Sequence, residues 1–227
     1  MPPRPASHSR LSLEESLRRD AELLARAEPA TRVAVLDGPI VSVGVAVRPE
    51  AQVVERCRRL GVPVLRRTTG GRAVLHLAGD LVWSLVLPRT DPRVGVDYVH
   101  AYDRLGAAPV HFLSEVGLEG RWTQAIAISD DCCLLGPEGS PLVVGERAVG
   151  GAAQHRTRSA LLHQGMIQAR IDRELLERVF AGDSPTTLRR VAGLEELGVK
   201  LAPEDLAARL KATLAAWRGP TPPAHIA

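Results

Sequence analysis

The spacing of hydrophobic residues predicts helices near both ends of the chain. After Ser12, leucines recur at helical intervals, and the Ser-x-x-Glu sequence that Ser12 begins is typical of a capped helix start. Gly61 is a stop signal for the helix expected before it. The further helical segments expected are 49–60, 98–116 and, with breaks near 182–185 and 198–203, 172–217.

Short apolar runs of strand length dominate the middle of the chain. The runs 33–36 and 40–47 flank the turn pair Asp37-Gly38, which predicts a hairpin. The sequence has no internal repeat and no regular strand–helix alternation. We therefore expect one α+β domain at 11–218, with a mixed or antiparallel sheet flanked by helices, between disordered ends at 1–10 and 219–227. The other expected strands are 62–66, 73–77, 81–87, 125–128, 132–135, 142–144 and 161–171.

Composition narrows the classes of function. With 45% hydrophobic and 24% charged residues, the chain is an ordinary globular mixture rather than a fibrous or fully disordered one. Few aromatic rings are available to stack on bases, and a net charge of only +3 is spread along the chain, so nucleic-acid binding is not expected. Among the 29 Lys and Arg residues, only Lys200 and Lys211 are lysines.

The cysteines and the apolar runs indicate the compartment. Cys57, Cys132 and Cys133 have neither metal-ligand spacing nor the separation of a disulfide framework, so a reducing environment and no metal site are expected. The N-terminal residues lack the apolar core of a signal peptide, and the apolar runs are too short to span a membrane. These features predict a cytoplasmic protein that does not bind membranes.

The segment 66–76, Arg-Arg-Thr-Thr-Gly-Gly-Arg-Ala-Val-Leu-His, is the densest chemical signal. Two glycines in a turn between strands let backbone amides approach a ligand, because no Cβ stands in the way. The arginines beside them can bind a carboxylate or a phosphate through two parallel hydrogen bonds. This segment therefore predicts a ligand-binding turn.

Together with its surroundings, this segment resembles the biotin/lipoate ligase and octanoyltransferase superfamily. A Ser-x-Gly strand at 42–44 and a helix precede it, as in that family. The later runs Gly79-Asp80, Gly150-Gly151-Ala152 and His163-Gln164-Gly165 also fit the family's pattern. The resemblance covers roughly residues 11–217.

The resemblance implies a catalytic domain of the biotin/lipoate ligase type, with a tunnel for a fatty-acyl, lipoyl or biotinyl chain. Biotin ligases fit less well, because their Gly-Arg-Gly-x-x-Gly-Arg loop is absent. His76 is placed at the edge of the acyl site, and the competing interpretation is a buried histidine that bonds a backbone carbonyl. The substrate-binding residues implied are Arg67, Gly70, Gly71, Arg72, His76, Gly150, Gly151 and Ala152.

The sequence departs from the family at its catalytic lysine. Arg147 occupies that position in one register, and Ala148 occupies it in a register shifted by one and anchored on Gln154. An arginine stays protonated, so Arg147 could polarise a carbonyl but could not act as a general base. A histidine would then have to move the proton, and His155 and His163 are the nearest candidates.

Cys132 and Cys133 match the cysteine that the cysteine-dependent octanoyltransferases carry upstream of the lysine position. A free thiol titrates near pH ~8.5, and a neighbouring guanidinium, for which Arg147 is the candidate, would raise the thiolate fraction. Successive side chains of a strand point to opposite faces, so only one of the two cysteines can face the tunnel. The alternative is that both are small buried core residues.

The resemblance favours an acyltransferase that moves an octanoyl or lipoyl group from acyl carrier protein to a lysine of a lipoyl domain. The candidate acceptors are the glycine cleavage H protein and the E2 of a 2-oxoacid dehydrogenase. The acyl group would pass through a cysteine thioester, and no cofactor is needed. Two alternatives stay open, an ATP-dependent lipoate-protein ligase and a non-catalytic relative that binds an acyl chain or a carrier protein. The candidate catalytic residues are Cys132, Cys133, Arg147 and His163.

Overall fold

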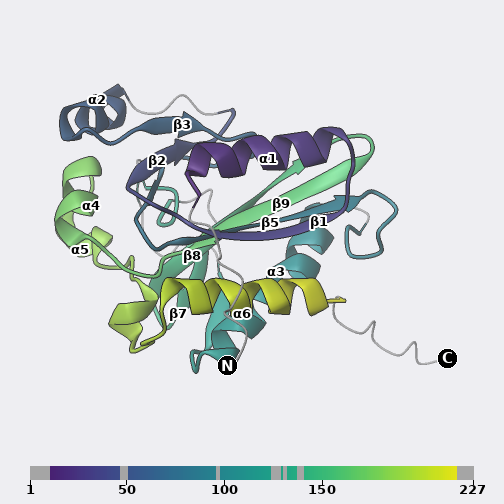
Figure 1. Ribbon diagram of the computed structural model, residues 1–227. Coiled ribbons are helices and arrows are strands. Elements are labelled where there is room, and N and C mark those ends of the chain that lie inside the picture. Colours follow the sequence, from purple (N-terminus) through teal and green to yellow (C-terminus); the bar gives the residue numbers. More distant parts are fainter. Residues whose placement is uncertain are drawn as a thin grey trace, which may run out of the picture.

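The computed structural model contains two β-sheets with helices around them (Figure 1). The structure describes residues 11–46, 51–95, 98–123, 129, 132–136 and 141–218. The larger sheet is antiparallel throughout, and the smaller one pairs β2 with β3 in parallel and with β4 antiparallel. The large sheet has the order β1 (Ala30–Val35), β5 (Leu81–Pro88), β9 (Ala160–Ile167), β8 (Arg147–Arg156), β7 (Pro141–Val144), β6 (Gly120–Trp122). The small sheet has the order β3 (Val64–Arg66), β2 (Ile40–Val43), β4 (Val74–His76).

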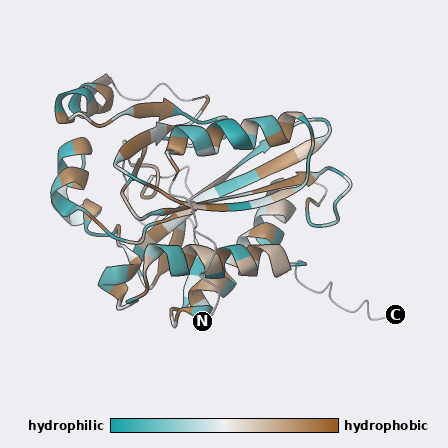
Figure 2. Ribbon diagram, viewed as in Figure 1, coloured by the Kyte–Doolittle hydropathy of each residue, from teal (hydrophilic) through white to brown (hydrophobic). Residues whose placement is uncertain are grey.

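Helices cover both faces of the large sheet. In Figure 1, α1 crosses one face above β5 and β9, while α3 and α6 lie on the opposite side. Strands β5 and β9 are buried along almost their whole length, as expected for strands covered on both faces. Figure 2 shows hydrophilic and hydrophobic stretches alternating along α6. The helices are α1 (Leu13–Ala25), α2 (Ala51–Leu60), α3 (Tyr98–Glu115), α4 (Arg173–Val179), α5 (Pro185–Leu188) and α6 (Pro203–Ala216), with a 3-10 turn at Leu194–Leu197.

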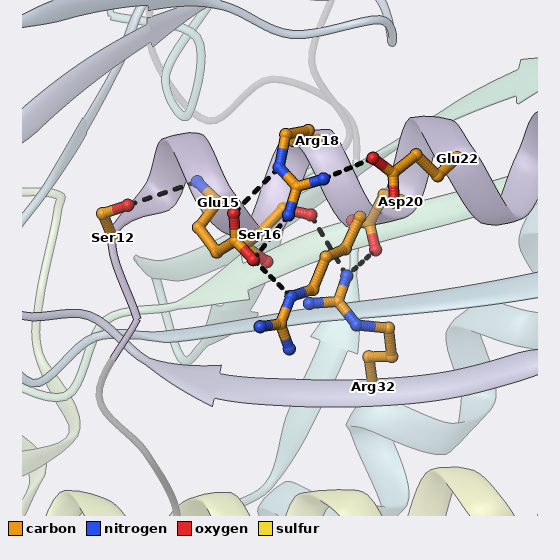
Figure 3. A network of polar contacts seen from close by, with 8 residues as sticks. Ser12, Glu15, Ser16, Arg18, Asp20, Glu22 and Arg32 are labelled. Atoms are coloured by element: carbon orange, nitrogen blue, oxygen red, sulfur yellow. Dashed lines mark hydrogen bonds and ion pairs between the residues drawn. The ribbon is translucent and has the colours of Figure 1, made fainter.

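Helix α1 begins at the capping sequence and has a charged outer face (Figure 3). The Ser12 hydroxyl accepts a hydrogen bond from the backbone N–H of Glu15 at 3.2 Å, as predicted. On the inner face, Asp20 is 4% exposed and is bonded to Arg32 and to the hydroxyl of Ser84. Burial raises the pKa of the Asp20 carboxyl, although the hydrogen bonds from Ser84 and Arg32 oppose the shift. This buried ion pair ties α1 to the large sheet.

The predicted fold class and most helices are confirmed, but the predicted hairpin is wrong. The runs on either side of Asp37-Gly38 enter different sheets, because β1 pairs with β5 while β2 pairs with β3 and β4. A turn pair encodes a change of direction, whereas the choice of partner strand depends on distant apolar strands such as β5. The two runs therefore belong to different sheets, β1 to the large sheet and β2 to the small one.

One further strand prediction is wrong, and one strand that lines the cavity was missed. At 132–135, only Cys132 makes an isolated β-bridge, to Ala73, and the chain then turns through Leu135. Strand β8 was not predicted, because its Gly-Gly-Ala-Ala core lacks the β-branched residues on which the prediction relied. The expected strand at 125–128 and the ends at 1–10 and 219–227 lie outside the described residues.

In the described part of the chain, no helix combines the length and the apolar character that crossing a membrane requires.

Candidate active site

A cavity of about 280 Å³ lies between α1, the small sheet and the central strands of the large sheet. Apolar side chains from α1, β4, β5 and β9 form much of its wall. Strand β8 contributes Gly151, Ala152, Ala153 and Gln154, and the loop after β3 contributes Thr69, Gly70 and Gly71. The apolar residues of the wall include Leu13, Leu17, Val74, Val82, Leu134 and Met166.

Of the two adjacent cysteines, only Cys133 lines the cavity. Its Sγ accepts a hydrogen bond from the backbone N–H of Arg72 at 3.2 Å and lies within hydrogen-bonding reach of the Arg67 guanidinium. Its own backbone N–H donates to the carbonyl of Ala73 at 2.8 Å, which fixes the residue beside the small sheet. Cys133 is therefore a half-buried thiol held between two hydrogen-bond donors.

Cys132 points away from the cavity into the hydrophobic core. It is 1% exposed, and burial raises the pKa of its thiol, which keeps the thiol protonated. Its backbone N–H donates to the Ser129 hydroxyl at 2.8 Å. The turn through Cys133, rather than the alternation of a strand, places the two thiols in different environments.

The side chain of Arg67 is wrapped by its own loop. Its guanidinium donates to the carbonyl of Gly70 at 2.8 and 3.1 Å and to the carbonyl of Arg72 at 2.9 Å. Arg67 is 7% exposed, and burial lowers its pKa while the contact with Cys133 opposes that shift. An arginine nevertheless remains a cation. The loop therefore presents a fixed positive charge to the Cys133 sulfur.

Gly71 has a backbone conformation and surroundings that exclude a side chain. Its φ is +91°, and a Cβ would lie 2.7 Å from Nη2 of Arg67 and 3.0 Å from Sγ of Cys133. At Gly70, by contrast, a Cβ would meet nothing within 4 Å. The Ser-x-Gly strand meets the loop here, because the N–H of Gly44 donates to the Gly71 carbonyl at 3.0 Å. Of the two loop glycines, Gly71 is therefore the one that has no room for a side chain beside Arg67 and Cys133.

His76 lines the cavity and is 5% exposed. Its Nε2 lies 2.8 Å from the hydroxyl of Ser42 on β2, so the alternative in which its ring bonds a backbone carbonyl is not observed. Burial, with a smaller contribution from the charge of Arg67, lowers the pKa of His76 to about 3. His76 is therefore a neutral ring at the wall of the cavity.

The two histidines proposed to move protons lie outside the cavity wall. His163 is fully buried, with Nδ1 3.1 Å from Nε2 of Gln154 and its ring packed against Trp83 and Tyr102. Burial lowers its pKa to about 3. His155 directs Nδ1 to the carbonyl of Thr68 at 2.7 Å. His163 therefore contacts residues of the wall from behind, whereas His155 bonds the loop at Thr68, outside the wall.

Burial of neutral His163 makes the free energy of unfolding pH-dependent. Between a folded pKa of about 3 and an unfolded pKa of ~6.5, the unfolded chain binds a proton that the folded protein does not, so stability falls as the pH falls through this window. His163→Phe should remove about 1.4 kcal/mol per pH unit from the slope. Urea unfolding between pH 4.5 and 6 measures it. Replacing the exposed His111 by Phe is the control, and an equal slope in wild type and His163→Phe would contradict the assignment.

Neither candidate for the lysine position projects into the cavity. Arg147 is the first residue of β8, about 10 Å or more along the strand from Gly151. Ala148 is fully buried and packs in the core on the cavity side of the sheet. Arg147 does not line the cavity, and the guanidinium beside the Cys133 sulfur is that of Arg67. The glycines behave differently, since Gly151 lines the cavity while Gly150 allows close packing against the carbonyl of Met166.

Several polar residues of the wall were not singled out from the sequence. Ser42 stood in the Ser-x-Gly motif without an assigned role, and Gln154 served only as an alignment anchor. Gln164 donates from Nε2 to the Thr69 hydroxyl at 2.9 Å, which links β9 to the glycine loop. The pairing of β8 with β9, which joins Ala153 to Gln164, could have revealed the two glutamines had β8 been predicted. Among the described residues, no three His, Cys, Asp or Glu side chains gather in a group suited to a metal ion.

Comparison with known proteins gives matches over most of the chain. The family profile described as "Lipoyl protein ligase A/B catalytic domain" matches residues 8–215. The octanoyltransferase LipM of Carboxydothermus hydrogenoformans is 32% identical over 181 residues, which cover 76% of this chain and 67% of that protein. The LipM of an Exiguobacterium species is 31% identical over 131 residues, 54% of this chain and 47% of that protein. The chain thus spans about half to two thirds of the length of the curated relatives it matches.

Solved structures show the same fold at lower identity. A lipoate-protein ligase A bound with ATP superposes with a TM-score of 0.71 at 22% identity, covering 88% of this chain and 78% of the other. A bipartite lipoate protein ligase from Thermoplasma acidophilum, studied with its E2 lipoyl domain, gives a TM-score of 0.69 at 22% identity, covering 88% and 76%.

Proposed function

Because this chain belongs to the lipoyl protein ligase A/B catalytic domain family, we propose that it is an acyltransferase that attaches an octanoyl or lipoyl group to a lysine of a lipoyl domain. The observation that carries the proposal is the Cys133 thiol, which lines an apolar cavity beside the cation of Arg67. The curated relatives named octanoyltransferase support the same reaction class.

The first step that we propose is acylation of Cys133. The sulfur attacks the carbonyl carbon of an acyl thioester on acyl carrier protein, a new carbon–sulfur bond forms, and the carrier's thiol leaves and takes up a proton. The guanidinium of Arg67 lies beside this sulfur and would offset the negative charge that the sulfur carries in the attack. The backbone N–H of Arg72 points at the same sulfur and adds a second donor.

In the second step, the amine of the acceptor lysine attacks the thioester on Cys133. An amide bond forms, the carbon–sulfur bond breaks, and the proton lost by the amine balances the negative charge left on the sulfur. Both steps exchange one acyl group between nucleophiles, so the reaction needs no metal and no nucleotide. The alternative in which ATP activates a free acid receives less support, because no lysine side chain enters the cavity from position 147 or 148.

The cavity fits one apolar chain better than a larger ligand. Its volume of about 280 Å³ lies just below the range of about 300–1,000 Å³ typical of small-molecule sites. Leu13 and Leu17 from α1 and Met166 from β9 give it the apolar surface that an alkyl chain would contact. The proposed acceptors are the glycine cleavage H protein and the E2 lipoyl domain, and the free cysteines are consistent with action in the reducing cytoplasm.

Acyl transfer from octanoyl carrier protein to an apo lipoyl domain, without ATP, tests the proposal. Mass spectrometry of the acceptor should show an octanoylated lysine when all three proteins are present and none when this protein is omitted. Transfer that occurs only from free octanoate or lipoate with ATP would establish the ligase instead. Failure with every donor would favour the non-catalytic relative.

The position of Arg147 gives a prediction that separates it from Arg67. Because Arg147 lies outside the cavity wall, Arg147→Ala should leave the transfer rate within about two-fold of the wild type, as is usual for a site away from the reacting atoms. Arg67→Gln is the matched comparison, because it removes the charge beside Cys133. Initial rates of transfer measured at one pH provide the test. If Arg147→Ala reduced the rate as much as Arg67→Gln does, Arg147 would have to act at the site.

A further inference from the structure

Ser42 lies in the middle of β2 and connects two residues of the cavity wall. It is 2% exposed, and its hydroxyl accepts a hydrogen bond from Nη1 of Arg67 at 2.9 Å. The same hydroxyl lies 2.8 Å from Nε2 of His76 on β4. The side chain of Ser42 thus bridges the loop that follows β3 and the adjacent strand of the small sheet.

The bond from Arg67 has a direction fixed by its chemistry, because a guanidinium donates hydrogen bonds and cannot accept them. A serine hydroxyl has one hydrogen and can accept from other donors. Since Nη1 of Arg67 donates to the oxygen, the hydroxyl hydrogen of Ser42 is free to be donated to Nε2 of His76. This arrangement requires a neutral His76, and burial together with the nearby Arg67 lowers the pKa of His76 to about 3. Ser42 is thereby fixed from both sides.

The guanidinium of Arg67 has two kinds of anchor. Nε and Nη2 bond to carbonyls of its own loop, those of Gly70 and Arg72, which move with the loop. The bond from Nη1 to Ser42 instead joins the guanidinium to a buried strand of the small sheet. This second anchor sets the orientation of the charge relative to Cys133, whose backbone N–H is bonded to the carbonyl of Ala73.

We propose that Ser42 is a positioning residue that holds the Arg67 guanidinium against the sulfur of Cys133 and so speeds the reaction of this thiol. The inference rests on the proposed role of Cys133 as nucleophile. Among the residues that the structure describes, the charged groups found to act on the cysteine pair are Arg67, from the loop after β3, and Asp183, from the turn after α4. Asp183 acts on the buried Cys132, which leaves Arg67 as the charge that Ser42 can direct at Cys133.

The pH dependence of Cys133 alkylation tests this without any acyl substrate. Iodoacetamide should modify Cys133 in the folded protein, because Cys57 and Cys132 are buried, and peptide mapping confirms the site. Ser42→Ala should slow alkylation at pH 7 by about 3- to 10-fold and move the pH–rate profile toward higher pH. Ser84→Ala is the matched control, since it also removes a buried strand hydroxyl, one bonded to Asp20 instead.

A second pair of variants separates the hydroxyl from the packing. Ser42→Thr and Ser42→Val have nearly the same shape, but only threonine keeps the hydroxyl. The threonine variant should keep the profile of the wild type, and the valine variant should shift like Ser42→Ala. The inference would be overturned if a folded Ser42→Ala variant had the same pH–rate profile of alkylation as the wild type. It would also be overturned if Ser42→Thr and Ser42→Val had the same profile as each other. Lack of acyl transfer by the wild type would instead contradict the proposed function, so the two failures are distinguishable.

Discussion

Gly71→Ala is expected to lower the acyl-transfer rate by about 100-fold or more, because misplacing a reacting group by about 1 Å can have that effect. The new Cβ would lie 2.7 Å from Nη2 of Arg67 and 3.0 Å from Sγ of Cys133, so one or both must move. The φ of +91° adds strain for any residue with a Cβ. Initial rates with octanoyl carrier protein and a lipoyl domain give the measurement.

Gly70→Ala is the matched control for this prediction. It adds the same methyl group one residue earlier, where a Cβ would meet no atom within 4 Å. We expect Gly70→Ala to keep most of the activity and both variants to remain folded, as judged by thermal unfolding. Equal activity of the two variants would mean that the contact between Arg67 and Cys133 does not determine the rate.

Cys133→Ser should lower transfer by about 1,000-fold or more, whereas Cys132→Ser should remain active. A serine hydroxyl is a far weaker nucleophile than a thiolate unless a strong base lies beside it, and the neutral His76 is bonded to Ser42. Cys132 contributes packing in the core, so its replacement should reduce stability by about 1 kcal/mol and leave the chemistry intact. Rates and urea unfolding of both variants separate the two effects.

The opposite ranking of the cysteine variants would contradict the assignment. If Cys132→Ser were inactive although folded, the turn that follows Cys132 would have to rearrange in the working enzyme. If both variants transferred the acyl group normally, the reaction would proceed without a covalent intermediate.

The glycine loop could be predicted from sequence because its chemistry is contiguous. Arg67, Gly70, Gly71 and His76 lie within one short segment, and the resemblance assigned them to one acyl site; the structure places all four at the cavity. The sequence also narrowed the proposed nucleophile to two adjacent cysteines. It could not separate them, because the isolated bridge of Cys132 with Ala73 and the turn after it depend on the small sheet.

The parts of the site that could not be predicted depend on pairing between distant strands. Ser42 reaches Arg67 because β2 runs parallel to β3, with Val43 beside Arg66, and the predicted hairpin had placed β2 elsewhere. Strand β8 contains two glycines and two alanines in a row, so its local composition carries no strand signal although it forms one wall of the cavity. Arg147 was the candidate to activate the cysteine because it stands at the position of the expected lysine. Strand β8 places Arg147 outside the cavity wall.

The site of acylation tests the central claim most directly. The protein is incubated with octanoyl carrier protein in the absence of ATP and of an acceptor, then weighed intact and mapped by peptide mass spectrometry before and after hydroxylamine. We predict one hydroxylamine-sensitive octanoyl group on Cys133 and none on Cys57 or Cys132. An acyl group on Cys132, or normal transfer to a lipoyl domain by an enzyme that never carries a thioester, would contradict the account.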